Sequence, residues 1–234
     1  MKAFLLAAGL GTRLRPLTDT VPKCLVPVAG RSLLDRWLDN FGAAGVDEVL
    51  VNLHHMPEQV VSHLAAHRGA PLVTTTYEPT LLGSAGTLAA GREFVGPDEV
   101  FLAVNGDDLT DFDLRHLVVA LAAAPAAEAA IAVFHAPRPE ACGILEVDGG
   151  VVVSFEEKPA VPRSDLANAG MYAFRRSVLD LVPENPPSDI GTHLLPRLVR
   201  RSVAVPVMNA FLMDIGTPEA LARAEVEWPL RGVA

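Results

Sequence analysis

Apolar positions along the chain fall into short continuous runs, separated by segments whose apolar residues recur at helical spacing. Five runs rich in Val, Ala, Leu and Phe predict strands buried on both faces, over residues 2–7, 48–53, 71–77, 100–104 and 129–135. The intervening segments predict helices with Ser32 and Asp113 as N-caps and Pro57 at a helix start, over residues 32–44, 57–67, 84–95 and 113–123. Alternating strands and helices predict an α/β fold, with a Rossmann-like, mostly parallel, twisted sheet flanked by helices.

The pattern changes after residue 140. Two apolar runs over 143–147 and 151–155 flank the turn Asp148-Gly149-Gly150 and predict a β-hairpin. Beyond it we expect a strand over 169–175, helices over 176–182 and 190–200, a strand pair across 203–214 and a final helix from Pro218. Because no Pro- or Ser-rich linker separates these segments, the sequence predicts a single domain over residues 1–234. Its C-terminal half would contain a small β-rich portion.

The composition narrows the classes of partner. Half of the 234 residues are hydrophobic, which is enough to bury a substantial core. No apolar run approaches the ~18 residues of a membrane span, and the apolar N-terminal run is too short for a signal peptide. The formal net charge of -9 argues against nucleic-acid binding, which needs a basic face. The two cysteines form neither a disulfide framework nor a zinc site. We therefore expect a cytoplasmic protein without nucleic-acid or membrane partners, and a homo-oligomer is compatible with the sequence.

The loop after the first predicted strand combines glycines with cationic side chains. It runs over residues 6–15 (LAAGLGTRLR) and is followed by Pro22-Lys23. Glycines let a backbone approach phosphate closely, and successive N–H groups form anion-binding concavities. The loop lacks the Gly-Lys-Ser/Thr of a P-loop, and Leu14 stands where a dinucleotide fingerprint needs its third glycine. A glycine turn with solvated arginines is the alternative, but Arg13, Arg15 and Lys23 together favour a triphosphate-binding loop.

Two aspartates follow apolar strands in distant parts of the chain. Asp107 comes directly after the strand over 100–104, and Asp214 ends an apolar run before the last helix. Magnesium in proteins is typically held by one or two carboxylates together with substrate phosphates. The sequence therefore predicts Asp107 and Asp214 as metal ligands, although an aspartate after a strand is more often a turn or helix cap. We expect the capping role for Asp108 and Asp111.

A lysine and a carboxylate end the second strand of the predicted hairpin, in residues 155–159 (FEEKP). Lys158 can neutralise a sugar phosphate, and the neighbouring carboxylate can accept hydrogen bonds from sugar hydroxyls. A surface charge cluster that ends at a proline is the alternative. Asn168 precedes the next strand and either bonds a hydroxyl or caps a turn. The seven histidines show no metal-ligand spacing, so we assign no metal to them.

Taken together, these segments resemble the sugar nucleotidyltransferase family, which includes mannose-1-phosphate guanylyltransferases, glucose-1-phosphate thymidylyltransferases, and heptose and muramic acid enzymes. The resemblance covers essentially the whole chain, with motifs in family order at residues 6–18, 22–23, 82–86, 105–107, 157–159, 168–170 and 214–218. It implies a fold of the nucleotide-diphospho-sugar transferase type, an NTP and a sugar phosphate as substrates, and Mg²⁺ as cofactor. Without hexapeptide repeats, a stand-alone catalytic domain is expected. The chain departs from the family pattern at Cys24 and Cys142, where a proline and an aromatic residue are usual.

The resemblance also implies roles for individual residues. Arg13 would contact the β and γ phosphates, Lys23 would face the reacting phosphates, and Lys158 would contact the sugar phosphate. Asp107 and Asp214 would hold the magnesium ion. Nucleotide binding is implied for Leu6, Ala8, Gly9, Gly11, Thr12, Arg13, Glu78, Gly83 and Gly86, and sugar binding for Gly143, Glu157 and Asn168. The implied reaction is an in-line attack of the sugar phosphate oxygen on the α-phosphorus.

The base and the sugar are less sharply indicated. Glu78 stands near the position where family members contact the base edge. A carboxylate only accepts hydrogen bonds, and guanine offers two adjacent donors where uracil or thymine offers one. This favours GTP, with UTP, dTTP, ATP or CTP as alternatives. If Glu78 has no role in base recognition, we expect it to be an exposed loop residue. Mannose, heptose, muramic acid and cyclitol phosphates all suit the sugar side.

Two other functional classes are weighed against the transferase. An NAD-dependent oxidoreductase would need a third glycine and an acidic residue at the end of the second strand, which instead ends Asn52-Leu53-His54. A non-catalytic nucleotide-binding regulatory module would be favoured by loss of Asp107, Asp214 or Lys158, and all three are present. The sequence therefore favours a catalytic transferase.

Overall fold

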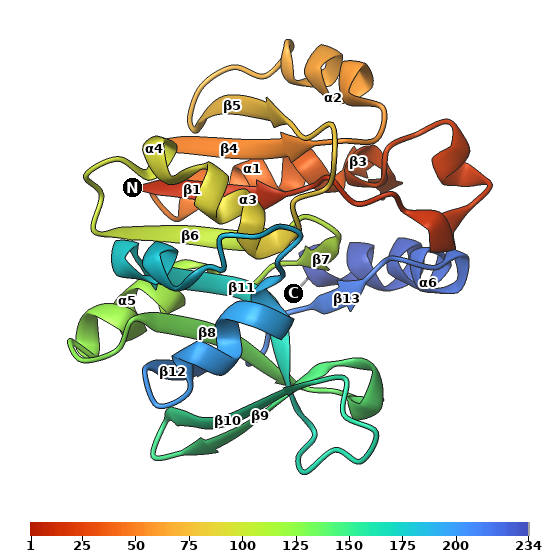
Figure 1. The fold of residues 1–234 in the computed structure, drawn as a ribbon. Helices are drawn as coiled ribbons and strands as arrows, with labels where there is room; N and C mark the ends of the chain where they lie inside the picture. The colour runs from red at the N-terminus through yellow and green to blue at the C-terminus, as the bar shows by residue number, and fades with distance from the viewer. Residues whose placement is uncertain (234) are drawn as a thin grey trace. The chain divides into compact units, whose positions relative to one another are not determined.

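The computed structural model describes residues 1–233 and has a mixed α/β fold (Figure 1). No helix among these residues is both long enough and apolar enough to cross a membrane. The helices are α1 Leu33–Ala43, α2 Pro57–Leu64, α3 Ser84–Ala90, α4 Arg92–Val95, α5 Arg115–Ala123 and α6 Pro218–Glu227. The strands are β1 Lys2–Leu6, β2 Pro27–Val28, β3 Arg31–Ser32, β4 Glu48–Leu53, β5 Leu72–Tyr77, β6 Val100–Asn105, β7 Asp108–Thr110, β8 Ala129–His135, β9 Gly143–Asp148, β10 Val151–Glu157, β11 Leu166–Arg175, β12 Ser202–Pro206 and β13 Leu212–Asp214.

The chain divides into two compact units. Unit 1 comprises residues 1–2, 82–104 and 114–208, and unit 2 comprises residues 3–81, 105–113 and those from 209 on. Each unit is therefore assembled from segments that are far apart in the sequence. A single catalytic domain over residues 1–234 stays a prediction.

Unit 2 contains the parallel strands that the alternating pattern predicted. Its strands are ordered β5-β4-β1, and β4 pairs with β5 in parallel along their whole length. The predicted cap of α1 is confirmed, because the Ser32 side chain accepts a hydrogen bond from Asp35 N. The apolar face of α1 is fully buried, through Leu33, Leu34, Trp37, Leu38 and Phe41.

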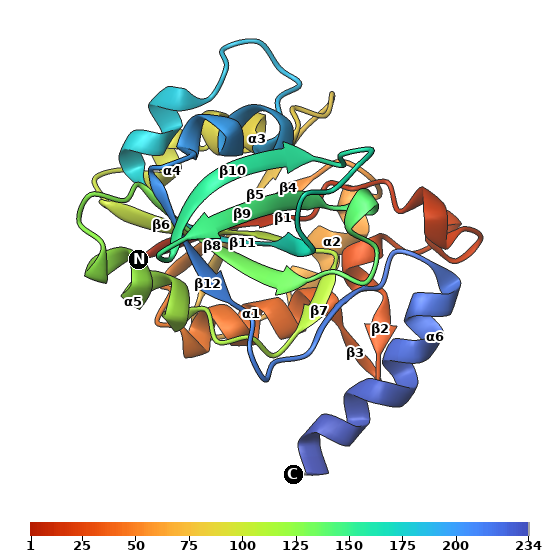
Figure 2. The same ribbon diagram turned by 90° about the horizontal axis from the view of Figure 1, so that it is seen from below.

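The C-terminal helix α6 packs in unit 2 beside the short hairpin β2–β3 (Figures 1 and 2). Ala29 N, in the turn of that hairpin, donates to Glu225 Oε2 of α6 at 2.9 Å. The core of this region joins residues from all three chain segments of the unit: Leu14, Val26, Val28, Leu33, Leu109, Ile215 and Ala224. Burying a leucine, isoleucine or valine contributes about 1.5–3 kcal/mol per side chain. This core fixes the loops that carry the charged residues described below.

Unit 1 contains a sheet of mixed direction, with strand order β6-β11-β8-β12-β10-β9. β11 is antiparallel to both β6 and β8, whereas β12 is parallel to β8, and α5 lies beside this part of the sheet (Figure 2). The predicted hairpin is confirmed as β9–β10. Its turn residues Gly149 and Gly150 have φ of 54° and 84°, the left-handed values that a tight hairpin turn requires. The predicted mostly parallel order is thus seen between β4 and β5 of unit 2, while the sheet of unit 1 mixes directions.

Three predicted α-helices have different boundaries. The helix expected over 84–95 is split at Gly91, where α3 ends and α4 begins, because glycine favours termination over continuation. α2 starts at Pro57 as predicted but ends at Leu64 instead of residue 67. Asp113 is not the N-cap of α5: Leu114 occupies that position, is fully buried and makes no side-chain cap bond. Burial of Leu114 therefore sets the start of this helix.

Later elements differ more strongly from the sequence prediction. The segments predicted as helices over 176–182 and 190–200 form 3-10 helices over Arg176–Leu181 and Leu195–Leu198 and a π-helical turn over Ile190–Leu194. Prolines at 183, 186, 187 and 196 disrupt regular α-helical bonding there. The two strands predicted across 203–214 are present as β12 and β13, but they do not pair with each other. β12 pairs with β8 and β10, and β13 pairs with β7, so each strand finds its partner far away in the sequence.

Candidate active site

The glycine-rich loop after β1 forms a tight turn in unit 2. Gly11 has a φ of +62°, and a methyl group there would lie 2.9 Å from Thr18 Cγ2. The Thr18 hydroxyl donates to Gly11 O at 2.7 Å and closes the turn. A 3-10 turn over Thr12–Leu14 follows, in which Leu14 is buried and the Arg13 side chain is exposed. Glycine is therefore required at position 11 both by the backbone angle and by the close approach of Thr18.

Strands β7 and β13 bring two distant aspartates together. They pair antiparallel, with Asp108 directly opposite Asp214. Phe211 fixes this register, because its N–H donates to Asp111 Oδ1 at 2.6 Å and its carbonyl accepts from Thr110 Oγ1 at 2.6 Å. Asp111 thus bonds the backbone of the opposite segment. Since residue 107 directly precedes β7 and Asp214 ends β13, the predicted metal ligands lie at the same end of the strand pair.

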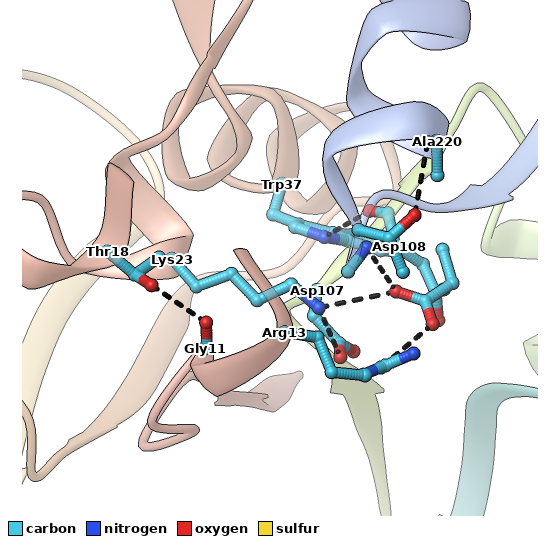
Figure 3. Close-up of polar contacts among 11 residues, drawn as sticks. Gly11, Arg13, Thr18, Lys23, Trp37, Asp107, Asp108 and Ala220 are labelled. Carbon is cyan, nitrogen blue, oxygen red and sulfur yellow. Dashed lines mark hydrogen bonds and ion pairs between the residues drawn. The ribbon is translucent and has the colours of Figure 1, made fainter. Parts of the chain in front are cut away.

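Lys23 bridges the two aspartates (Figure 3). Its Nζ lies 2.8 Å from Asp107 Oδ2 and 3.3 Å from Asp214 Oδ1, and its side chain is 8% exposed. Arg13 Nη2 contacts the other oxygen of Asp214 at 3.1 Å. Gly216 N also donates to Asp214 Oδ1, at 2.7 Å. The predicted cations at 13 and 23 and the predicted aspartates therefore form one cluster.

The charges of the cluster act differently on two of its carboxyl groups. Burial raises the pKa of Asp214, but Lys23 and Arg13 outweigh that effect and hold the pKa below its usual value. Burial raises the pKa of Asp108 well above its usual value, and the neighbouring charges of Asp107 and Asp214 add to the rise. The main-chain oxygen of Asp108 accepts from Trp37 Nε1 at 3.1 Å. Asp214 is thus ionised at neutral pH, whereas Asp108 resists ionisation.

The pair of carboxylates fits a hard divalent cation. In the part of the chain that the structure describes, no group of three or more His, Cys, Asp or Glu residues could hold a metal ion. Magnesium needs fewer protein ligands, because phosphates and water complete its coordination. The Lys23 ammonium lies within 3.3 Å of both carboxylates and so marks a position that favours positive charge. The donor set is therefore compatible with Mg²⁺ bound together with a phosphate ligand.

Asn52 and Glu78 form a buried polar pair connected to the glycine-rich loop. Asn52 Nδ2 donates to Glu78 Oε1 at 2.9 Å, and Asn52 Oδ1 accepts from Ala7 N at 2.7 Å. His54 Nδ1 lies 2.7 Å from Glu78 O. Glu78 is 4% exposed, so it is not the exposed loop residue that the sequence left as an alternative. Asn52 was missed by sequence reasoning, although a polar residue inside an apolar strand signals a buried hydrogen-bond partner.

In unit 1, the end of β10 brings together three residues of the predicted sugar site. Glu157 pairs in register with Gly143, and a methyl group at Gly143 would lie 2.7 Å from Glu157 Oε2. Lys158 Nζ lies 3.8 Å from Glu157 Oε1, and the main-chain N–H of Lys158 donates to Cys142 O at 3.0 Å. Lys158 has a φ of +47°, a left-handed backbone that is uncommon outside glycine and often marks a functional position. Burial raises the pKa of Glu157, Lys158 opposes this shift, and Asp189 adds to it.

Gly83 and Gly86, also in unit 1, allow two backbone segments to cross. Gly83 has a φ of +76°, and a methyl group there would lie 2.5 Å from Ser188 O. That carbonyl accepts hydrogen bonds from Ala85 N at 2.9 Å and Gly86 N at 3.0 Å. Ser188 N donates to Leu82 O at 2.8 Å. Glycine at position 83, next to the predicted base-facing Gly86, is therefore needed for this crossing.

Two of the predicted residues bond within their own segments. Arg15 Nε lies 3.1 Å from Asp19 Oδ1, so the predicted third cation forms its ion pair outside the aspartate cluster. Asn168 Oδ1 accepts from Gly170 N at 3.1 Å, and its Nδ2 donates to Tyr172 Oη at 2.7 Å. These bonds stabilise the irregular stretch of β11 between residues 168 and 172. A sugar-binding role for Asn168 stays a prediction.

Comparison with known proteins identifies the family. A family model described as nucleotidyl transferase matches residues 2–229. The chain belongs to this family. Mannose-1-phosphate guanylyltransferase 1 of Arabidopsis thaliana is 33% identical to it, over 93% of this chain and 62% of the relative. The UTP–glucose-1-phosphate uridylyltransferase of Synechocystis sp. is 32% identical, over 97% of this chain and 59% of the relative. The chain thus spans about three fifths of the length of the curated relatives it matches.

Solved structures agree with the fold of this nucleotidyl transferase. A Bacillus anthracis structure described as a glucose-1-phosphate thymidylyltransferase is similar to it, with a TM-score of 0.84 and 25% sequence identity. The alignment covers 97% of this chain and 94% of the other. The predicted mixed α/β fold of the nucleotide-sugar transferase type is therefore confirmed.

Proposed function

We propose that this nucleotidyl transferase moves a nucleoside monophosphate from an NTP to a sugar-1-phosphate and releases pyrophosphate. The bridging of Asp107 and Asp214 by Lys23, with Arg13 alongside, carries this proposal. This cluster combines a pair of carboxylates that could bind a divalent cation with two cationic side chains that could contact phosphates, next to a glycine-rich turn. The names of the relatives, which are guanylyl-, uridylyl- and thymidylyltransferases of sugar phosphates, support the reaction class.

Unit 2 contains the residues that we assign to the triphosphate and the metal. The backbone from Leu6 to Thr12 would receive the triphosphate, because its glycines leave room for close approach and its N–H groups are anion donors. Arg13 and Lys23 would neutralise phosphate charge. Asp107 and Asp214 would hold Mg²⁺, which when bound polarises phosphate oxygens and offsets the charge that develops on the leaving pyrophosphate.

Unit 1 contains the residues that we assign to the sugar phosphate. Glu157 would accept hydrogen bonds from sugar hydroxyls, and the mostly exposed Lys158 ammonium would contact the phosphate. Gly143 leaves the space that the Glu157 carboxylate occupies. In the reaction a sugar phosphate oxygen forms a bond to the α-phosphorus, and the bond between that phosphorus and the pyrophosphate oxygen breaks. Because no bond to the protein is required, positioning and charge neutralisation supply most of the rate.

For the nucleotide we propose GTP. The guanylyltransferase names of several relatives support this choice. UTP is the second candidate, because the Synechocystis relative that covers almost the whole chain is named as a uridylyltransferase. The buried bond from Asn52 to Glu78 Oε1 occupies one oxygen of the carboxylate that we had expected at the base edge.

Pyrophosphate release tests the proposal. The common NTPs are crossed with a panel of sugar and cyclitol 1-phosphates in the presence of Mg²⁺, and release should require one NTP together with one sugar phosphate. Asp107→Asn should abolish release, whereas Asp39→Asn, which removes an exposed aspartate of the same unit, should leave it unchanged. No release with any pair, despite measurable NTP binding, would instead support a non-catalytic nucleotide-binding module. Undiminished release by Asp107→Asn would contradict the metal assignment.

A further inference from the structure

The Glu157 carboxylate lies against two glycines that come from different elements of unit 1. Gly143 belongs to β9, and Gly191 belongs to the π-helical turn Ile190–Leu194. A methyl group at Gly191 would lie 2.5 Å from Glu157 Oε2 and 3.1 Å from its Cδ, and one at Gly143 would lie 2.7 Å from the same Oε2. Such separations are well inside carbon–oxygen van der Waals contact. The carboxylate therefore occupies space that exists only because both positions lack a side chain.

The backbone of Gly191 does not itself require glycine. Gly143 and Gly191 are both absent from the residues with positive φ, so an L-residue could adopt either backbone. The close approach of Glu157 is what makes glycine necessary at position 191. An alanine at position 191 could keep the same local backbone conformation. Its methyl group would instead clash with the Glu157 carboxylate.

The turn that carries Gly191 is held in place by Ser84 and Asp189. Ile190 N donates to Ser84 Oγ at 2.8 Å, and Ser84 N donates to Asp189 Oδ1 at 3.2 Å. His193 N donates to Asp189 O at 2.9 Å. Because these bonds fix the start of the turn, the clash caused by a side chain at position 191 would be relieved mainly by movement of Glu157. π-helical turns of this kind are frequent at functional sites.

We propose that Gly191 is a positioning residue, which sets the location of the Glu157 carboxylate for recognition of hydroxyl groups on the sugar phosphate. The inference rests on the proposed function and adds a residue that no sequence motif marked. A side chain at position 191 would displace the carboxylate from the place where it accepts hydroxyl hydrogen bonds. The loss would therefore fall on the sugar substrate and not on the nucleotide.

A double-mutant cycle in urea denaturation tests the contact without using activity. Gly191→Ala should lower the denaturation midpoint of the chain that retains Glu157. In the Glu157→Ala background the clashing oxygen is absent, so the same substitution should leave the midpoint unchanged or raise it slightly, because alanine lowers the entropy of the unfolded chain. An equal loss in both backgrounds would overturn the inference, since Gly191 would then act on the fold independently of Glu157. This measurement decides the contact even if pyrophosphate release is never observed, which would be a failure of the proposed function alone.

Steady-state kinetics test the role in sugar recognition. With the substrate pair identified above, Gly191→Ala should raise KM for the sugar phosphate about tenfold, as expected for one lost charged hydrogen bond. It should leave KM for the NTP within about twofold of its original value. In the Glu157→Ala background the substitution should change neither constant. An equal rise in both KM values, or an unchanged KM for the sugar phosphate, would refute the positioning role.

Discussion

Replacing Lys23 with methionine should make the nucleotide-free protein bind divalent cations more tightly. A cation that binds Asp107 Oδ2 and Asp214 Oδ1 together must displace the Lys23 ammonium group, which contacts both of these oxygens. Methionine keeps most of the apolar stem of lysine and removes that competing charge. The two carboxylates would then repel each other with only Arg13, beside Asp214, left as compensation, and a divalent cation would relieve the repulsion. Lys23→Met should still weaken NTP binding, so the cation must be measured alone.

The geometry sets the size of the effect. Ion pairs at 2.8 and 3.3 Å correspond to about 6 and about 5 kcal/mol at an effective dielectric constant of about 20. Both aspartates are nearly half exposed, at 43% and 46%, so solvent screens most of this attraction. A net value of about 1 kcal/mol for each contact gives roughly 2 kcal/mol in total. Tenfold in affinity corresponds to about 1.4 kcal/mol, so Lys23→Met should bind the cation about 30-fold more tightly.

The assay is a titration with Mn²⁺ alone, in which free Mn²⁺ is followed by electron paramagnetic resonance. Arg15→Met serves as the matched control, because it removes a cation of the same loop whose partner is Asp19 and not the aspartate pair. The control should bind Mn²⁺ like the unmodified protein, and Mn²⁺ should raise the melting temperature of Lys23→Met more than that of the control. Equal or weaker Mn²⁺ affinity in Lys23→Met would refute the reasoning, because Lys23 and the cation would then not compete for one position.

Three further predictions concern the same unit. Gly216→Ala would place a methyl group 2.6 Å from Arg13 Nη2 and 2.7 Å from Asp214 Oδ1. Because the Arg13 and Asp214 side chains are 61% and 46% exposed and can move into solvent, its urea midpoint should stay near the original value while kcat/KM for pyrophosphate release falls about 10–100-fold; unchanged kcat/KM would contradict this. Asn52→Ala removes the acceptor of Ala7 N and a partner of a buried carboxylate, so urea unfolding should show a loss of about 2–3 kcal/mol. A loss of unfolding free energy within about 0.5 kcal/mol would show that the Asn52–Glu78 pair is unimportant for stability. Burial raises the pKa of the Cys24 thiol to about 12, above its unfolded value, so the thiol contributes stability that is lost as pH rises from about 9 toward about 12. Between about pH 8 and about pH 10.5 the unfolding free energy should fall by about 2 kcal/mol more than in Cys24→Ala, and parallel pH profiles would disprove it.

Local pattern was sufficient for the strands and for the residues that follow them. Asp107 could be predicted as a candidate site residue because a buried strand ends in an Asn-Gly-Asp turn, and residues at such ends face the ligand side of a sheet. Ser32 as a cap and Pro57 as a helix start are likewise local features, and both are present in the structure. The hairpin around Gly149 was predictable because two adjacent glycines favour only a few tight turns.

Features that depend on distant partners could not be predicted in this way. β12 and β13 are neighbours in sequence but pair in different units, so their alternating patterns gave no information about their partners. Gly191 follows no motif, and its importance arises only from the carboxylate that approaches it from β10. Asn52 carried a detectable signal, since a buried amide in an apolar strand needs a partner. Its partner Glu78 is more than a strand and a helix away, and only the folded chain brings the two together.

The discontinuous build of unit 2 has a consequence for synthesis of the protein. Asp107 leaves the ribosome long before Asp214, because the strand β13 belongs to the last segment of the unit. At about 5–20 residues per second, roughly 5–20 seconds separate the two aspartates during translation. Throughout that interval the nascent chain contains only one of the two carboxylate partners of Lys23. A divalent cation therefore cannot stabilise the growing chain through this pair, and its binding becomes available as a source of stability only when the final strand has been made.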